Sequence, residues 1–84
     1  MALFEYKGVR PVVGPDCYIA DSAEIIGKVV IGSGVYVGPG AKIRGDYGTL
    51  HIGDGTAVEE NCVLHARPEE LCAIGRRVTL GHMC

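Results

Sequence analysis

A branched aliphatic residue at every sixth position is the feature that most constrains how this chain can fold. The register runs through eleven repeats, with a slip of three residues before Ile52 and a slip of four before Ile74. The repeated positions are Val13, Ile19, Ile25, Ile31, Val37, Ile43, Ile52, Val58, Leu64, Ile74 and Leu80. Glycine follows six of these eleven residues. This pattern predicts an all-β chain, a parallel β-helix in which each hexad supplies one short strand and one turn.

The repeat also predicts how the chain is organised. Three hexads close one triangular coil, so the repeats would form nearly four coils in a single domain over residues 13–84. Residues 1–12 precede the repeat, and Phe4 and Tyr6 alternate there in a strand-like segment that ends at Pro11. We expect this lead-in to cover the strand edges of the first coil. No segment has the 3.6-residue apolar period of a helix.

Both slips in the register are expected at one corner of the β-helix. Assigning the hexads to three sides in turn places Ile25, Ile43 and Leu64 above one another, and both slips follow hexads on that side. Insertions in a solenoid are expelled from its turns, so two would leave one corner in consecutive coils. Such clustered excursions indicate either a functional site or tolerated surface loops.

Composition and charge exclude several classes of function. The formal net charge of −2 gives no basic surface for nucleic acid. We find neither a signal peptide nor an apolar run of about 18 residues, which favours a cytoplasmic protein without a membrane partner. The four cysteines lack a CxxC spacing, so structural thiols are favoured over a disulfide or a zinc cluster. Cys17, Cys62 and Cys84 fall on the small inward position of the repeat, and Cys72 lies in an insertion.

Polar residues interrupt the repeat at a few neighbouring positions. Arg44 and His65 each occupy the place after the aliphatic residue, where glycine is otherwise preferred. They fall on one side, one coil apart, so the repeat places the guanidinium beside the imidazole. Asp46 lies two residues after Arg44 and would point to the same face. His82 belongs to the following coil. These four residues form the candidate site.

The segments around these residues resemble one branch of the hexapeptide-repeat proteins. Arg44-Gly45-Asp46, then Asn61 followed four residues later by His65, then Gly81-His82 are similar to the γ-class carbonic anhydrases and their relatives. Those relatives include proteins of phenylacetate and carnitine operons and the ferripyochelin-binding proteins. The resemblance covers essentially the whole chain. It implies a left-handed β-helix and a homotrimer with metal sites between subunits, here without the usual C-terminal helix.

The resemblance also implies a ligand set. Three histidines would bind zinc, or alternatively cobalt or ferrous iron, with His65 and His82 matching two of them. The third histidine would follow His82 by five residues, beyond Cys84. We therefore expect a truncated chain with an impaired site, which is poorly active by itself, and a longer form that binds zinc.

The reaction that the resemblance implies is the reversible hydration of carbon dioxide to bicarbonate, a lyase activity. Three neutral imidazoles leave zinc an open position for water, whose hydroxide attacks carbon dioxide. Arg44 would orient bicarbonate and Asp46 would hold Arg44. Glu59 stands where the family has Gln beside the metal-bound water, and it would either accept the proton or misplace the anion. Glu69 and Glu70 lie in a shortened loop, and the sequence identifies no proton shuttle.

Other interpretations remain open at this point. The chain could be an acyltransferase that uses acyl-coenzyme A, as other hexapeptide proteins are, or a non-catalytic assembly protein in which the metal cements a trimer. Arg44 and Asp46 could form an interface salt bridge in either case. His51 has no partner at ligand spacing, and we expect it to be exposed rather than to bind metal.

Overall fold

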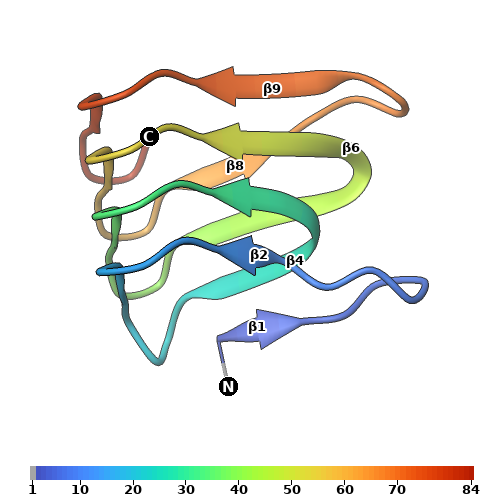
Figure 1. Cartoon of the computed structure of the whole chain (residues 1–84), viewed down its shortest axis with the longest axis horizontal. Coiled ribbons are helices and arrows are strands. Elements are labelled where there is room, and N and C mark those ends of the chain that lie inside the picture. Colours follow the sequence, from blue (N-terminus) through green and yellow to red (C-terminus); the bar gives the residue numbers. More distant parts are fainter. Residues whose placement is uncertain (1) are drawn as a thin grey trace.

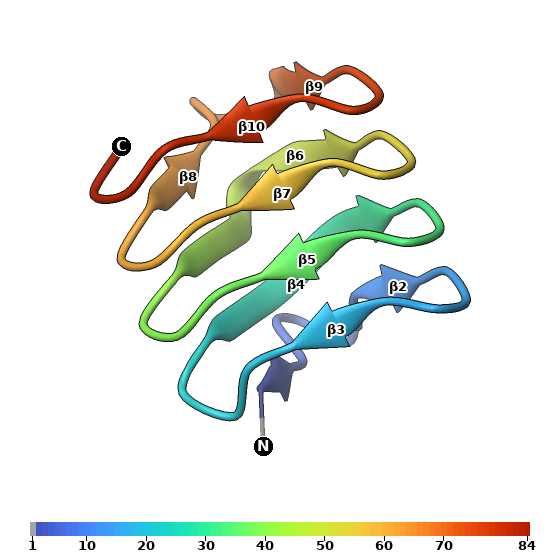
Figure 2. The same ribbon diagram turned by 90° about the vertical axis from the view of Figure 1, so that its left-hand side faces the viewer.

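The computed structural model describes residues 2–84 as a left-handed parallel β-helix with no helix in that range. The chain winds through stacked coils whose strands lie directly above one another (Figures 1 and 2). The strands are β1 (Leu3–Phe4), β2 (Val12–Val13), β3 (Tyr18–Ile19), β4 (Glu24–Ile31), β5 (Tyr36–Val37), β6 (Lys42–Ile52), β7 (Ala57–Val58), β8 (Val63–His65), β9 (Leu71–Ile74) and β10 (Thr79–Leu80). The predicted fold class is confirmed.

The sixfold repeat places its aliphatic residues in three inward columns, as predicted. Each strand pairs in parallel with the strand one coil away, so equivalent side chains stack at one strand spacing. The columns are Val13–Ile31–Ile52–Ile74, Ile19–Val37–Val58–Leu80 and Ile25–Ile43–Leu64. The middle members of each column are buried and form the core. The period of the sequence therefore fixes which residues are neighbours across coils.

The lead-in segment covers the first coil. Strand β1 pairs with β4, and Leu3 lies opposite Ile25. Tyr6 and Val9 then exchange two backbone hydrogen bonds in a tight antiparallel turn. Strand β1 therefore occupies the lower edge of β4 on this one side of the first coil. No helix within residues 2–84 is long and apolar enough to cross a membrane.

The first slip in the register does not form a loop, which corrects our expectation of two expelled insertions. Strand β6 continues around the corner without interruption and pairs with β4, with a register shift between Gly27 and Val29. The extra residues are absorbed inside the strand, where Leu50 is buried opposite Val29. The second slip does leave the coil, as the loop 66–70 between β8 and β9. A strand that bends at glycines can accommodate three extra residues without leaving the sheet.

The cysteines behave as separate thiols, and all four are free. Cys62 is buried, with Sγ 2.9 Å from the carbonyl oxygen of Gly81, and Cys17 is half-buried. Two positions differ from the prediction. Cys72 lies within β9 rather than in an insertion, and Cys84 is exposed rather than inward.

Candidate functional site

Arg44, Asp46 and His65 form a hydrogen-bonded group on the outer face of β6 and β8. Arg44 pairs in register with His65, so the two side chains emerge side by side from adjacent coils. The Arg44 guanidinium donates from Nε and Nη2 to Oδ2 of Asp46, at 3.1 and 2.9 Å. The other carboxylate oxygen, Oδ1, lies 2.9 Å from Nε2 of His65. Asp46 thus bridges the guanidinium and the imidazole. The spacing of the sequence places Arg44 beside His65, but the contact between Asp46 and His65 was not predicted.

The environment of Asp46 holds it as a carboxylate. Burial raises its pKa, since only 12% of the side chain is exposed. The hydrogen bonds from Arg44, from the Tyr47 backbone N–H at 2.7 Å and with His65 outweigh this effect, and the pKa falls from 3.8 to about 2. Asp46 therefore carries a full negative charge that its neighbours neutralise. The ring of Tyr47 also lies beside His65, with ring centroids 5.4 Å apart.

The depressed pKa of Asp46 predicts acid-sensitive stability. A carboxyl whose folded pKa lies below its unfolded value stabilises the fold above the unfolded pKa and loses that contribution as pH falls toward the folded one. For a shift from 3.8 to about 2, the contribution is about 2 kcal/mol, lost between roughly pH 4 and pH 2. Asp46→Asn is expected to be less stable than the unaltered chain at pH 6, with the difference shrinking below pH 4. Urea unfolding at several pH values checks this, with Asp21→Asn at an exposed turn as control. If the difference in free energy of unfolding between Asp46→Asn and the unaltered chain did not change with pH, the lowered pKa of Asp46 would be contradicted.

A second polar group surrounds His82. Its Nε2 lies 3.2 Å from Oε1 of Glu59, and its Nδ1 lies 2.6 Å from Oε1 of Glu60. Both are ion-pair contacts, and Oε1 of Glu60 is enclosed without a hydrogen-bond partner. The other oxygen of Glu60 accepts a hydrogen bond from the Tyr36 hydroxyl at 3.0 Å. A backbone hydrogen bond to the Glu60 carboxylate and the hydrogen bond from the Tyr36 hydroxyl lower the pKa of Glu60. The hydrogen bond between these two side chains also raises the pKa of Tyr36.

The predicted site residues thus fall into two groups. Arg44, Asp46 and His65 form one group, and Glu59 and His82 belong to the other. Among residues 2–84, the set of ligand atoms close enough to share a metal ion is Glu59, Glu60 and His82, within 4.8 Å of one another. His65 is not in this set. His51 is exposed, as expected.

The sequence reasoning missed Glu60 and Tyr36. The repeat pattern offers a signal for Tyr36 alone, because Tyr36 lies in register with Tyr18, and the two rings stack 5.5 Å apart. Ala57 occupies the next coil of this column, so no ring continues the stack there. The Tyr36 hydroxyl bonds instead to the side chain of Glu60.

Comparison with known proteins agrees with the repeat fold. A family model described as bacterial transferase hexapeptide, with six repeats, matches residues 10–45. That range holds the first two members of each inward column, from Val13 to Ile43. Over these residues the chain matches the hexapeptide-repeat family.

Curated relatives of this hexapeptide-repeat chain are carnitine operon proteins. The protein CaiE of Proteus sp. (strain LE138) is 42% identical over 98% of the chain, and CaiE of Escherichia coli O157:H7 is 37% identical over the same share. The chain spans only 42% of the length of each. A crystal structure of a hexapeptide transferase family protein from Anaplasma phagocytophilum superposes with a TM-score of 0.93 at 38% identity, over 99% of this chain and 48% of that one.

Proposed function

We propose that this hexapeptide-repeat chain contributes the histidines and the anion-orienting group of a γ-carbonic-anhydrase-like metal site, which hydrates carbon dioxide reversibly to bicarbonate. The observation that carries the proposal is the bridged group Arg44–Asp46–His65. It places a fixed cation beside an exposed imidazole on adjacent coils. A structural salt bridge between Arg44 and Asp46 does not require the imidazole of His65. A site that holds an anion beside a metal uses the guanidinium for the anion and the imidazole for the metal.

The donor atoms present suit zinc. Imidazole nitrogens and carboxylate oxygens are ordinary zinc ligands, and both His65 and His82 are exposed at the surface. Because Nε2 of His65 faces Asp46, its Nδ1 is the nitrogen left for another ligand in this arrangement. Carboxylates that orient metal-binding histidines are common around such sites. When bound, zinc supplies a water molecule that ionises near neutral pH.

The chain's own residues would then perform three tasks. Arg44 holds and orients the bicarbonate anion through its guanidinium, which stays in place because Asp46 accepts two of its hydrogen bonds. Asp46 also fixes the orientation of the His65 ring. Glu59 is half-buried beside His82, where it can accept a proton.

The proposal includes a homotrimer in which His65 and His82 of neighbouring copies meet. Within one chain the two histidines belong to different groups, each paired with its own carboxylates. A site that needs both of them is therefore best completed across an interface. Cyclic assembly of identical chains provides the same contact at every interface.

The test is a carbon dioxide hydration assay combined with metal analysis. Both are made on the 84-residue chain and on any longer natural form, because the chain spans less than half of its curated relatives. We expect hydration to depend on bound zinc, to fall on the order of 100-fold or more after chelation, and to return when zinc is restored. Hydration that is indifferent to chelation would overturn the proposal. Acetyl transfer from acetyl-coenzyme A that survives chelation would favour the acyltransferase alternative.

A further inference from the structure

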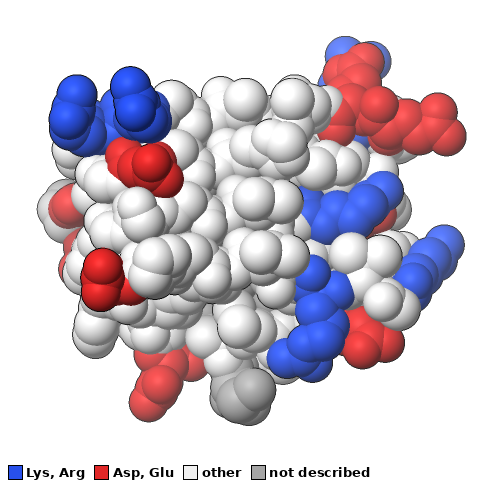
Figure 3. All heavy atoms as spheres, in the orientation of Figure 1, with Lys and Arg blue, Asp and Glu red and all other residues white. Residues whose placement is uncertain are grey.

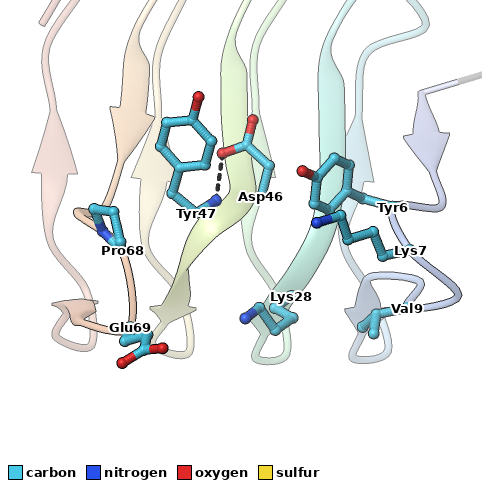
Figure 4. Close-up of a pocket in the computed structure, with 8 residues that line it drawn as sticks. All are labelled: Tyr6, Lys7, Val9, Lys28, Asp46, Tyr47, Pro68 and Glu69. Atoms are coloured by element: carbon cyan, nitrogen blue, oxygen red, sulfur yellow. Dashed lines mark hydrogen bonds between the residues drawn. The ribbon is translucent and has the colours of Figure 1, made fainter.

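A pocket of about 480 Å³ opens at the corner where β4 and β6 bend. Four segments that are distant in the sequence form it: the lead-in turn, the bend of β4, the bend of β6 and the loop before β9 (Figure 4). The lining residues are Tyr6, Lys7, Val9, Lys28, Asp46, Tyr47, Pro68 and Glu69. The volume falls in the range of small-molecule sites.

The charge in this pocket is unbalanced in favour of cations. Within residues 2–84, neither Lys7 nor Lys28 has an ion-pair partner. Asp46 does not compensate them, because Arg44 and His65 already bind its carboxylate. The carboxylate of Glu69 points away from both lysines (Figure 4). Lysine and arginine side chains lie on this side of the molecule together with acidic side chains (Figure 3). The pocket therefore presents two available ammonium groups.

The remaining walls of the pocket are largely apolar. The ring of Tyr6 faces the pocket with the ammonium of Lys7 5.6 Å from its centroid. The ring of Tyr47 stands on the other side of Asp46, and Val9 and Pro68 complete the wall. An inorganic anion would leave these surfaces in contact with water. A ligand with both an anionic end and an apolar body would cover them.

Gly27 and Gly45 lie at this corner and contribute no side chain to the pocket. A Cβ at Gly27 would collide with the carbonyl of Gly45, and it would also lie 3.1 Å from the Cβ of Tyr6. A Cβ at Gly45 would overlap the backbone of Lys28. The backbones of the two coils are therefore in direct contact here, and no side chain from these glycines fills the space between the lysines. The close approach of the two coils at this corner is therefore set by the backbone, and the side chains around it complete the pocket.

We propose that this pocket binds a small organic monocarboxylate, with its carboxylate held by Lys7 and Lys28 and its apolar body against Tyr6, Val9 and Pro68. This goes beyond the proposed hydration site, because the ligand is neither a metal nor carbon dioxide. The pocket shares Asp46 with that site. An occupant would therefore lie next to the group that positions Arg44 and His65.

The experiment measures binding of benzoate to the purified protein by chemical-shift changes of ¹⁵N-labelled backbone amides. Benzamide serves as the uncharged ligand of the same shape, and inorganic phosphate as the anion without an apolar body. We expect benzoate to shift the amides of residues 6–9, 28, 46–47 and 69; Pro68 has no amide N–H to observe. Benzamide and phosphate are expected to bind at least about tenfold more weakly, the loss expected for one charge-assisted or apolar contact.

Variants distinguish the pocket from a general attraction of anions. Lys28→Met is expected to weaken benzoate binding about tenfold, and Lys28→Arg is expected to retain it. Arg76→Met removes one positive charge from an exposed turn outside the pocket and is the matched control. The proposal is overturned if Lys28→Met and Arg76→Met have equal effects, if benzamide binds as well as benzoate, or if phosphate binds and benzoate does not.

Discussion

In a zinc-binding form of the protein, His65→Ala is expected to remove most of the bound metal and to lower carbon dioxide hydration on the order of 100-fold or more. The imidazole emerges from β8 in register with Arg44 and is the exposed nitrogen donor of the bridged group. Alanine leaves the core unchanged, since the residue lies on the outer face and its neighbour Leu64 fills the inward position. Metal content by mass spectrometry and the initial rate of hydration check this prediction.

His51→Ala is the matched control, because this exposed histidine lies on the outer face of β6 and has no place in either polar group. We expect it to keep the metal content and the rate. Thermal unfolding of both variants should show little change. Metal content and rate that are unchanged in His65→Ala would remove the basis of the proposed function.

Gly45→Val is expected to destabilise the fold by about 3 kcal/mol or more, enough to unfold much of a small domain. Gly45 lies at the bend of β6, where a Cβ would overlap the carbonyl of Lys28 and lie 2.7 Å from its backbone nitrogen. These are backbone atoms of the adjacent coil, so no side-chain rotation relieves the overlap. Two paired strands would have to separate.

Gly81→Val provides the control for Gly45→Val. Nothing lies within 4 Å of the position of a Cβ at Gly81. Its free energy of unfolding in urea should therefore stay within about 1 kcal/mol of that of the unaltered chain. Equal loss of stability in the two variants would show that close approach of the coils is not what requires glycine at position 45.

The repeat allowed most of the fold to be predicted, because a parallel β-helix converts sequence spacing directly into contacts between coils. The stacking of Ile25, Ile43 and Leu64 followed from counting hexads. The pairing of Arg44 with His65 followed from the same count. Left-handedness had to come from resemblance, since the period is the same for either hand.

Two features escaped prediction for physical reasons. The count locates a slip in the register but does not show whether the chain loops out or bends within the strand, and β6 bends. The count also gives side-chain positions without rotamers. The pairing of His82 with Glu60, and of Glu60 with Tyr36, depends on how long side chains turn across the surface. The pocket at the corner depends both on the bend of β6 and on the rotamers of its side chains.

The proposed function requires His65 and His82 of neighbouring copies to build one metal site. Mixing His65→Ala chains with His82→Ala chains tests it most directly, after unfolding and refolding the two together. Each variant alone should lack metal and hydration activity. Every mixed trimer should regain one intact interface, which restores about a quarter of the sites of the unaltered trimer when equal amounts assemble at random. Recovery of metal and activity to about that level is the predicted result. Activity of the mixture no greater than that of the separate variants would contradict a site shared between copies.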